Sequence, residues 1–194
     1  SHGGRITMIA GQSDDKTGGA ISIATGYGST TSSGTFSIRT PDAGSSGVSG
    51  ALSFITGTTS SGSSGSIAIS TGSSNGGTGG NVSITVGAGT SASGGRIGIS
   101  AGSSTSLTAG DISIVSGYGE GTSSGSFSIQ TAKSTDTGGV SGNMSLSTGE
   151  SSNGLSGWMA LRTGSGENGA GGSIRVMVGT GSKTSGGRIT VSAG

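Results

Sequence analysis

The sequence has no cysteine, one proline, one histidine, and few charged or aromatic residues. Without cysteine, no disulfide can staple a small fold and no thiolate is present for nucleophilic or metal chemistry. Charged residues make up 9% of the chain and the formal net charge is +1, so we expect no nucleic-acid surface. No apolar run reaches the roughly 18 residues of a transmembrane helix. The sequence therefore predicts no membrane span.

Large apolar side chains are also scarce. Hydrophobic residues make up 27% of the chain, against roughly 45–50%, glycine included, in typical domains. Glycine contributes 46 of the 194 residues, which excludes a thick core of large side chains. A flexible Gly/Ser linker has this composition, but disordered chains usually carry a high net charge, which this one lacks. We therefore expect order from regular backbone hydrogen bonding with thin, repetitive burial.

The chain is built from a unit of about 15 residues, Gly-x-Ile-Ser-Ile-x-Thr-Gly followed by a Ser/Gly-rich tail. Ten of the twelve spacings between units are 15 residues, and the other two are 16 and 17. Repeats of this length are typical of solenoids, in which one unit cannot bury its apolar face alone. The first glycine of each unit is Gly4, Gly19, Gly34, Gly50, Gly65, Gly80, Gly95, Gly110, Gly125, Gly142, Gly157, Gly172 or Gly187.

Apolar residues lie two positions apart in each unit, which is typical of a β-strand, and no helical period is present. Fifteen residues are too few for a hairpin with its own core but suit one coil. The sequence predicts an all-β fold, a parallel β-solenoid of about thirteen 15-residue coils with a flat, two-faced cross-section. The predicted inward ladders contain Ile6, Ile21, Ile23, Phe36, Ile38, Ile67, Ile69, Ile84, Ile97, Ile99, Ile112, Ile114, Phe127 and Ile129.

The end of each strand and the tail that follows it give three further predictions. The Thr after the second apolar residue, as at Thr25, is expected at the edge of the core, partly buried. The next residue, usually glycine but Pro41 in one longer unit, is expected at a corner that needs positive φ. The tail is expected to return as a second, thinner sheet. A loop or polyproline-like return is the alternative.

A longer period overlies the short one. Residues 26–40 match residues 117–131, and the two long spacings correspond. The prediction is a single solenoid over 1–194 with a six-coil super-repeat at 4–94, 95–186 and a partial 187–194. Six coils would advance about 29 Å at the spacing of parallel strands. Such an outer period indicates regular docking of a neighbouring chain or a glycan, with simple duplication as the alternative. The candidate docking residues are Arg5, Arg96, Arg188, Tyr27, Tyr118 and Trp158.

Residues with catalytic or metal-binding chemistry are few and isolated. His2 is the one histidine, so neither a zinc site nor a Ser-His-Asp triad is expected. The acidic residues do not recur in each unit, which excludes a calcium-binding β-roll. Gly26-Tyr27-Gly28 lacks the Gly-Lys-Ser/Thr ending of a phosphate loop. The sequence therefore predicts no enzyme, no catalytic residue, no metal ligand and no cofactor.

The GGxIxIxTG units with their Ser/Gly-rich tails resemble β-solenoid repeats of extracellular filaments, including mastigoneme-like and surface-fibre proteins of algae and protists. The resemblance implies an extracellular or cell-surface, polymeric and glycosylated protein. Asn81 and Asn143 stand in N-glycosylation sequons.

We expect a structural subunit or segment of a fibre, self-assembling end to end or laterally, with itself and glycans as partners. Both ends cut the repeat without a capping unit, which favours a segment of something longer or a subunit that stacks on its neighbours. The alternative is an ice-binding or polysaccharide-binding module with a flat Ser/Thr face.

Overall fold

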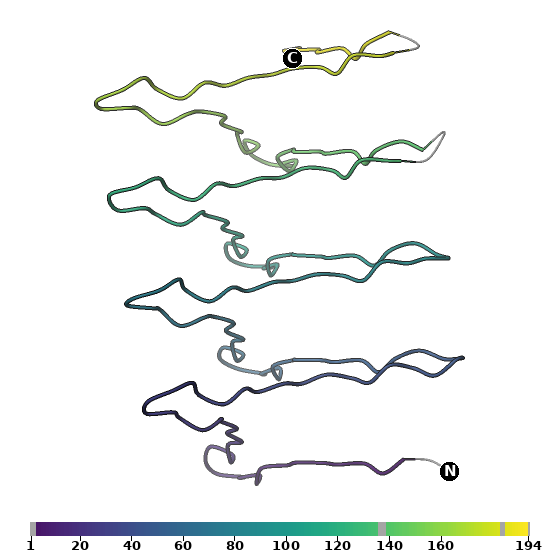
Figure 1. Cartoon of the computed structure of the whole chain (residues 1–194), viewed down its shortest axis with the longest axis vertical. Coiled ribbons are helices and arrows are strands. Elements are labelled where there is room, and N and C mark those ends of the chain that lie inside the picture. The colour runs from purple at the N-terminus through teal and green to yellow at the C-terminus, as the bar shows by residue number, and fades with distance from the viewer. Residues whose placement is uncertain (1–2, 136–138, 183–184, 194) are drawn as a thin grey trace. The chain divides into compact units, whose positions relative to one another are not determined.

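The computed structural model describes residues 3–135, 139–182 and 185–193. Within those ranges the chain forms neither a helix nor a strand. Segments of the apolar pattern alternate with loops at which the chain doubles back (Figure 1). The predicted all-β parallel solenoid of about thirteen coils is therefore wrong.

The backbone hydrogen bonds give the physical reason. A solenoid of 15-residue coils needs ladder bonds between residues about 15 apart in sequence. The backbone bonds found in the described ranges instead join glycines eight residues apart, as from the Gly34 amide to the Gly26 carbonyl oxygen at 3.0 Å. The other pairs, donor first, are Gly19 and Gly11, Gly110 and Gly102, Gly125 and Gly117, and Gly187 and Gly179. The apolar segments thus have no neighbour to complete a sheet.

Each 15-residue unit consists of an extended segment followed by a loop. We call the stretch from the first glycine of a unit through its Thr the segment, for example residues 19–25. The loop runs from the next residue to the first glycine of the following unit, for example residues 26–34. That glycine therefore ends one loop and also begins the next segment. The two units of irregular length have their extra residues in loops 41–50 and 132–142, so the insertions leave the segments unchanged. The Ser/Gly-rich tail is therefore a loop, the alternative left open above, and not a second sheet.

The predicted inward ladders do not form a core. No residue is buried in the described ranges, and the ladder residues named above are 51% to 93% exposed. The accessible surface of the chain is 19496 Å², against roughly 8,000 Å² for a compact protein of this mass. The chain by itself therefore leaves most of its apolar surface in water.

The chain divides into two units, Ser1–Ile97 and Gly98–Gly194. Each contains the same alternation of segment and loop. The boundary falls within segment 95–101, in which Arg96 directly follows the first glycine. The six-coil super-repeat remains a prediction from the sequence.

Positive φ occurs at loop interiors rather than at the predicted corners. The described glycines with left-handed backbone are Gly47, Gly62 and Gly121, at φ of 135°, 102° and 78°. None of them directly follows a segment. Five of the glycines that do, Gly26 among them, accept the backbone bonds that close their loops.

Candidate functional site

Each loop closes at a neck, which consists of the last residue of one segment and the first glycine of the next. A Cβ built on Gly34 would stand 3.3 Å from the Cβ of Thr25, and one on Gly80 would stand 3.1 Å from that of Thr71. The same approach recurs at every unit from Gly19 to Gly187. At most units a side chain in place of this glycine would therefore press on the neck residue, whereas at Gly125, Gly142 and Gly157 the nearest neck atom would lie at an ordinary contact distance of 3.5 to 3.7 Å. The neck residues are Ala10, Thr25, Thr40, Thr56, Thr71, Val86, Ala101, Ser116, Thr131, Thr148, Thr163 and Val178.

Some neck residues are less exposed than the rest of their segments. Val86 and Val178 are 41% and 42% exposed, the lowest values among the large apolar residues. Ala10, Thr40 and Thr56 are three of the few described residues that are partly covered. The predicted partial burial of this position is therefore found at Ala10, Thr40 and Thr56, whereas the other neck residues, Thr25 included, are exposed.

Threonine adds a hydrogen bond at three necks. The hydroxyls of Thr25, Thr71 and Thr163 donate to carbonyl oxygens nine residues on, at Gly34, Gly80 and Gly172, over 3.0 to 3.1 Å. At the first of these necks the backbone bond from Gly34 to Gly26 lies beside the side-chain bond. At these three necks threonine therefore has a local role.

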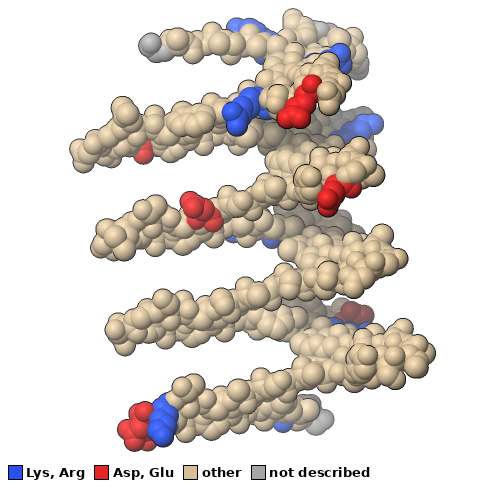
Figure 2. Space-filling view, turned by 90° about the vertical axis from the view of Figure 1, so that its left-hand side faces the viewer, with Lys and Arg blue, Asp and Glu red and all other residues tan. Residues whose placement is uncertain are grey.

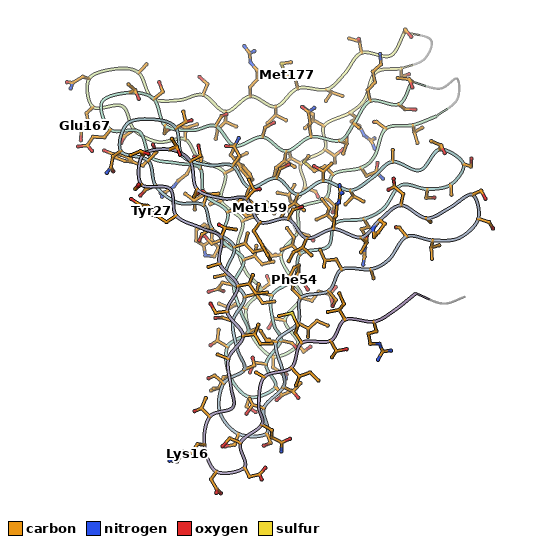
Figure 3. All side chains as sticks on the ribbon, turned by 60° about the horizontal axis from the view of Figure 1, so that its bottom comes forward. Lys16, Tyr27, Phe54, Met159, Glu167 and Met177 are labelled. Carbon is orange, nitrogen blue, oxygen red and sulfur yellow. The ribbon has the colours of Figure 1, made fainter. Side chains whose placement is uncertain are left out.

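Most loops fall into two classes, distinguished by their third residue, and loop 41–50, with Ala43 there, belongs to neither. In the first class this residue is Ser or Thr, and at several loops its hydroxyl braces the bend at the loop tip. The Oγ atoms of Ser13, Ser74 and Ser104 accept from the amides of Lys16, Gly77 and Leu107 at 2.9 to 3.0 Å. This is a side-chain turn of the kind that serine commonly forms. Lys16 lies at the tip of such a loop (Figure 3).

In the second class the third residue is glycine, and the backbone folds onto it. A Cβ on Gly28 would stand 2.5 Å from the Ser32 carbonyl oxygen, and one on Gly166 would stand 2.8 Å from that of Gly169. Gly89 and Gly119 face the same clash. The glycine of these Gly-x-Gly motifs is therefore explained by a close backbone approach.

The segments have two unlike faces. Along a segment the apolar pair and the neck residue share one face, which we call the apolar face, and the residues between them share the polar face. Ile21 and Ile23, on the apolar face, are 52% and 60% exposed. Large apolar residues at polar-face positions, such as Ile55, Val115 and Trp158, are 84% to 85% exposed. The alternation predicted from the sequence is present, but the apolar face is only half covered.

The predicted docking residues occupy two kinds of place. Arg5, Arg96, Arg188 and Trp158 directly follow a unit's first glycine, on the polar face, and are exposed. Tyr27 and Tyr118 are the second residues of glycine-class loops and are 88% and 89% exposed. Figure 3 shows Tyr27 projecting from its loop.

Both sequons are accessible. Asn81 and Asn143 lie at the same polar-face position as Arg96, and each is exposed. The hydroxyl of Ser83 lies 3.5 Å from that of Thr85.

The alternative function, binding of ice or polysaccharide, was predicted for a flat Ser/Thr face. Such a face requires coils stacked in register, and the described residues do not form these coils.

Two shallow hollows, open to solvent, lie at necks where arginine precedes threonine. One, of about 350 Å³, is lined by Arg39, Thr40, Pro41 and Asp42. The other, of about 440 Å³, is lined by Arg162, Thr163, Gly164 and Ser165. The sequence analysis predicted no site at these positions, although both hollows contain an Arg-Thr pair.

Charges are sparse on the surface (Figure 2). In the described residues no group of three or more His, Cys, Asp and Glu side chains is placed to hold a metal ion. Nor do those residues include a helix long and apolar enough to cross a membrane. His2 and Asp136 lie outside the described ranges. The strongest candidate for function is therefore the repeated apolar face and not a cleft.

No protein-family model, curated protein or solved structure matches the chain.

Proposed function

We propose that this chain is a structural subunit of an extracellular filament, which self-associates so that neighbouring copies cover one another's apolar faces. The observation that carries the proposal is the uncovered apolar pair, repeated in unit after unit. Soluble monomers rarely leave large contiguous apolar surface exposed, and such surface commonly marks a site of association.

The amount of exposed apolar surface favours an assembly of chains over a monomer. Ile112 and Ile114 are 54% and 64% exposed, and the other pairs are similar. Fully burying one such side chain stabilises by about 1.5–3 kcal/mol. Covering the exposed half of one pair therefore contributes roughly 1.5–3 kcal/mol. Repeated over many units, this gain exceeds the entropic cost of joining two chains, which is roughly 4–15 kcal/mol.

The repeat also suits a polymer. Each unit presents the same face, so a copy can contact its neighbour in more than one register and an assembly can grow without closing. Ser, Thr and Gly, which make the loops, bring little side-chain entropy to be lost on ordering. A second copy is therefore the partner we propose.

The test compares a variant of the apolar face with one of the polar face. Ile112→Ser with Ile114→Ser removes one apolar pair, and Val115→Ser changes an equally apolar residue of the same segment that is 85% exposed. Wild type is expected to form filaments, seen by electron microscopy and by light scattering. The double variant should raise the critical concentration at least tenfold, and V115S should change it less than threefold. Wild type that stays monomeric at millimolar concentration would overturn the proposal.

Secretion and glycosylation form part of the same proposal. Asn81 and Asn143 are accessible to an oligosaccharide transferase. Expression through a eukaryotic secretory pathway should add a glycan mass at each, removed singly by N81Q and N143Q. Peptide masses without any glycan would contradict this part.

A further inference from the structure

The charges of this chain are divided between segments and loops. All six arginines lie in segments, where Asp111 is the one acid. Seven of the eight acids lie in loops, against three lysines. The segments therefore carry an excess of positive charge and the loops an excess of negative charge, although the whole chain is close to neutral. The segment arginines are Arg5, Arg39, Arg96, Arg162, Arg175 and Arg188, and the loop acids are Asp14, Asp15, Asp42, Glu120, Asp136, Glu150 and Glu167.

The arginines also share one face. Each stands at an even position of its segment, counting the first glycine as one, and so lies on the polar face. Each is exposed, and its polar-face neighbours are mostly Ser, Thr, Ala and Gly. A guanidinium among such small side chains is accessible to a carboxylate from outside the chain, and guanidinium with carboxylate is a favoured pairing.

The acids are presented where a second molecule can reach them. Asp14 and Asp15 lie in the bend of a loop whose tip bears Lys16, and Glu167 lies at the tip of another (Figure 3). The described loop acids are all exposed. Asp14 accepts a bond from Gln12 at 3.0 Å, which orients that carboxylate within its own loop.

From this division we infer that the polar faces of the segments bind the acidic loops of a second copy of the chain. The contact rests on the self-association proposed above and gives it a second surface. The apolar faces supply most of the binding free energy, and the arginines and loop acids select the register and the lateral neighbour. Electrostatic complementarity governs specificity in this way more than it governs affinity.

The surface should respond to salt. Exposed ion pairs are individually weak and are screened by salt, and the Debye length falls from about 10 Å at 0.1 M to 3 Å at 1 M. Several weak pairs acting together therefore make lateral association tenfold or more weaker at 1 M than at 0.1 M sodium chloride. The apolar contacts do not weaken in this way.

The experiment uses two neutralised variants and their mixture. In one variant the six segment arginines become Gln. In the other the described loop acids are neutralised: Asp14→Asn, Asp15→Asn, Asp42→Asn, Glu120→Gln, Glu150→Gln and Glu167→Gln. The control variant neutralises loop lysines, as Lys16→Gln with Lys133→Gln. Lateral association is measured by light scattering and by filament width in electron micrographs at 0.1 M salt.

Each neutralised variant alone should form thinner filaments, with lateral association reduced at least tenfold, and the lysine control should not. An equimolar mixture should regain lateral association, because one variant retains the arginines and the other retains the acids. Filaments of wild-type width and salt response from both variants would overturn this inference and leave the proposed function intact. A mixture that fails to recover would also overturn it. Wild type that never associates would remove the proposed function as well.

Discussion

The hydroxyl of Thr25 donates to the carbonyl oxygen of Gly34 over 3.1 Å, and the Cβ of Thr25 lies 3.3 Å from where a Cβ on Gly34 would stand. The same two residues thus bond and exclude a larger side chain. At this neck, and at those of Thr71 and Thr163, the side-chain bond joins residues nine apart. It also explains why the repeat retains both glycine and threonine at these places.

Gly34→Ala should open the neck of its loop. The new methyl group would press on Thr25 and weaken both the side-chain bond and the bond from the Gly34 amide to Gly26. At about 1 kcal/mol per bond, amide exchange at residue 34 should quicken roughly fivefold or more. Gly26→Ala is the matched control, since nothing lies within 4 Å of a Cβ there. Equal exchange in the two variants would count against the neck.

Thr71→Val should remove a hydrogen bond while leaving the neck closed. Val86 and Val178 occupy the same position at other necks, so the shape is compatible. The lost bond from the Thr71 hydroxyl to the Gly80 carbonyl oxygen costs about 0.5–1.5 kcal/mol. The carbonyl ¹³C resonance of Gly80 should move upfield. In Thr56→Val the corresponding resonance of Gly65 should stay in place, and a shift of equal size there would contradict the assignment.

Gly119→Ala should disrupt a glycine-class loop. A Cβ at this position would collide with the Ser123 carbonyl oxygen and stand 3.1 Å from that of Thr122. Relieving such overpacking costs about 1–3 kcal/mol. Protection of the Gly125 amide, which donates to Gly117 at 2.9 Å, should fall about tenfold. Gly117→Ala has open space around its Cβ and should leave this protection unchanged. Retained protection in G119A would refute the close approach.

Ser104→Ala should loosen the bend of a hydroxyl-braced loop. The Ser104 Oγ accepts from the Leu107 amide at 2.9 Å and from the Ser106 amide at 3.4 Å. Without it, exchange at Leu107 should quicken about three- to tenfold. Ser103→Ala, one residue earlier, removes a hydroxyl outside this turn and should have no such effect. Unchanged exchange at Leu107 in S104A would show that the serine does not brace the bend.

Part of this architecture could be predicted from the sequence. The 15-residue unit, the alternation within segments and the places of the two longer spacings follow from local patterns. Whether neighbouring segments pair could not be predicted, because period-2 alternation describes a segment and not its partner. In the structure, the contact between Thr25 and Gly34 closes the tail into a loop. The pattern of apolar residues does not predict this contact, because neither of the two residues belongs to the apolar pair.

The arginine and tyrosine candidates for docking were found from their recurrence and Trp158 from its parity, and the structure adds where they lie. Arg96 and Trp158 share a polar-face position that the alternation alone assigns. The requirement for glycine at Gly28 and Gly119 could not be read from the sequence, since it comes from carbonyl groups of Ser32 and Ser123 that approach only after the loop has folded. The expected 29 Å axial period depended on stacked coils and falls with them.

The most direct measurement is residue-resolved amide exchange at low and at high protein concentration. In dilute solution the amides of the neck glycines Gly19, Gly34, Gly110 and Gly125 should be protected, while segment amides such as those of Ile21 and Ser22 should exchange close to their intrinsic rates. On concentration into the assembled form, the segment amides should become protected. Segment amides that are already protected in the dilute monomer would contradict the account, because they would show that the segments pair within one chain.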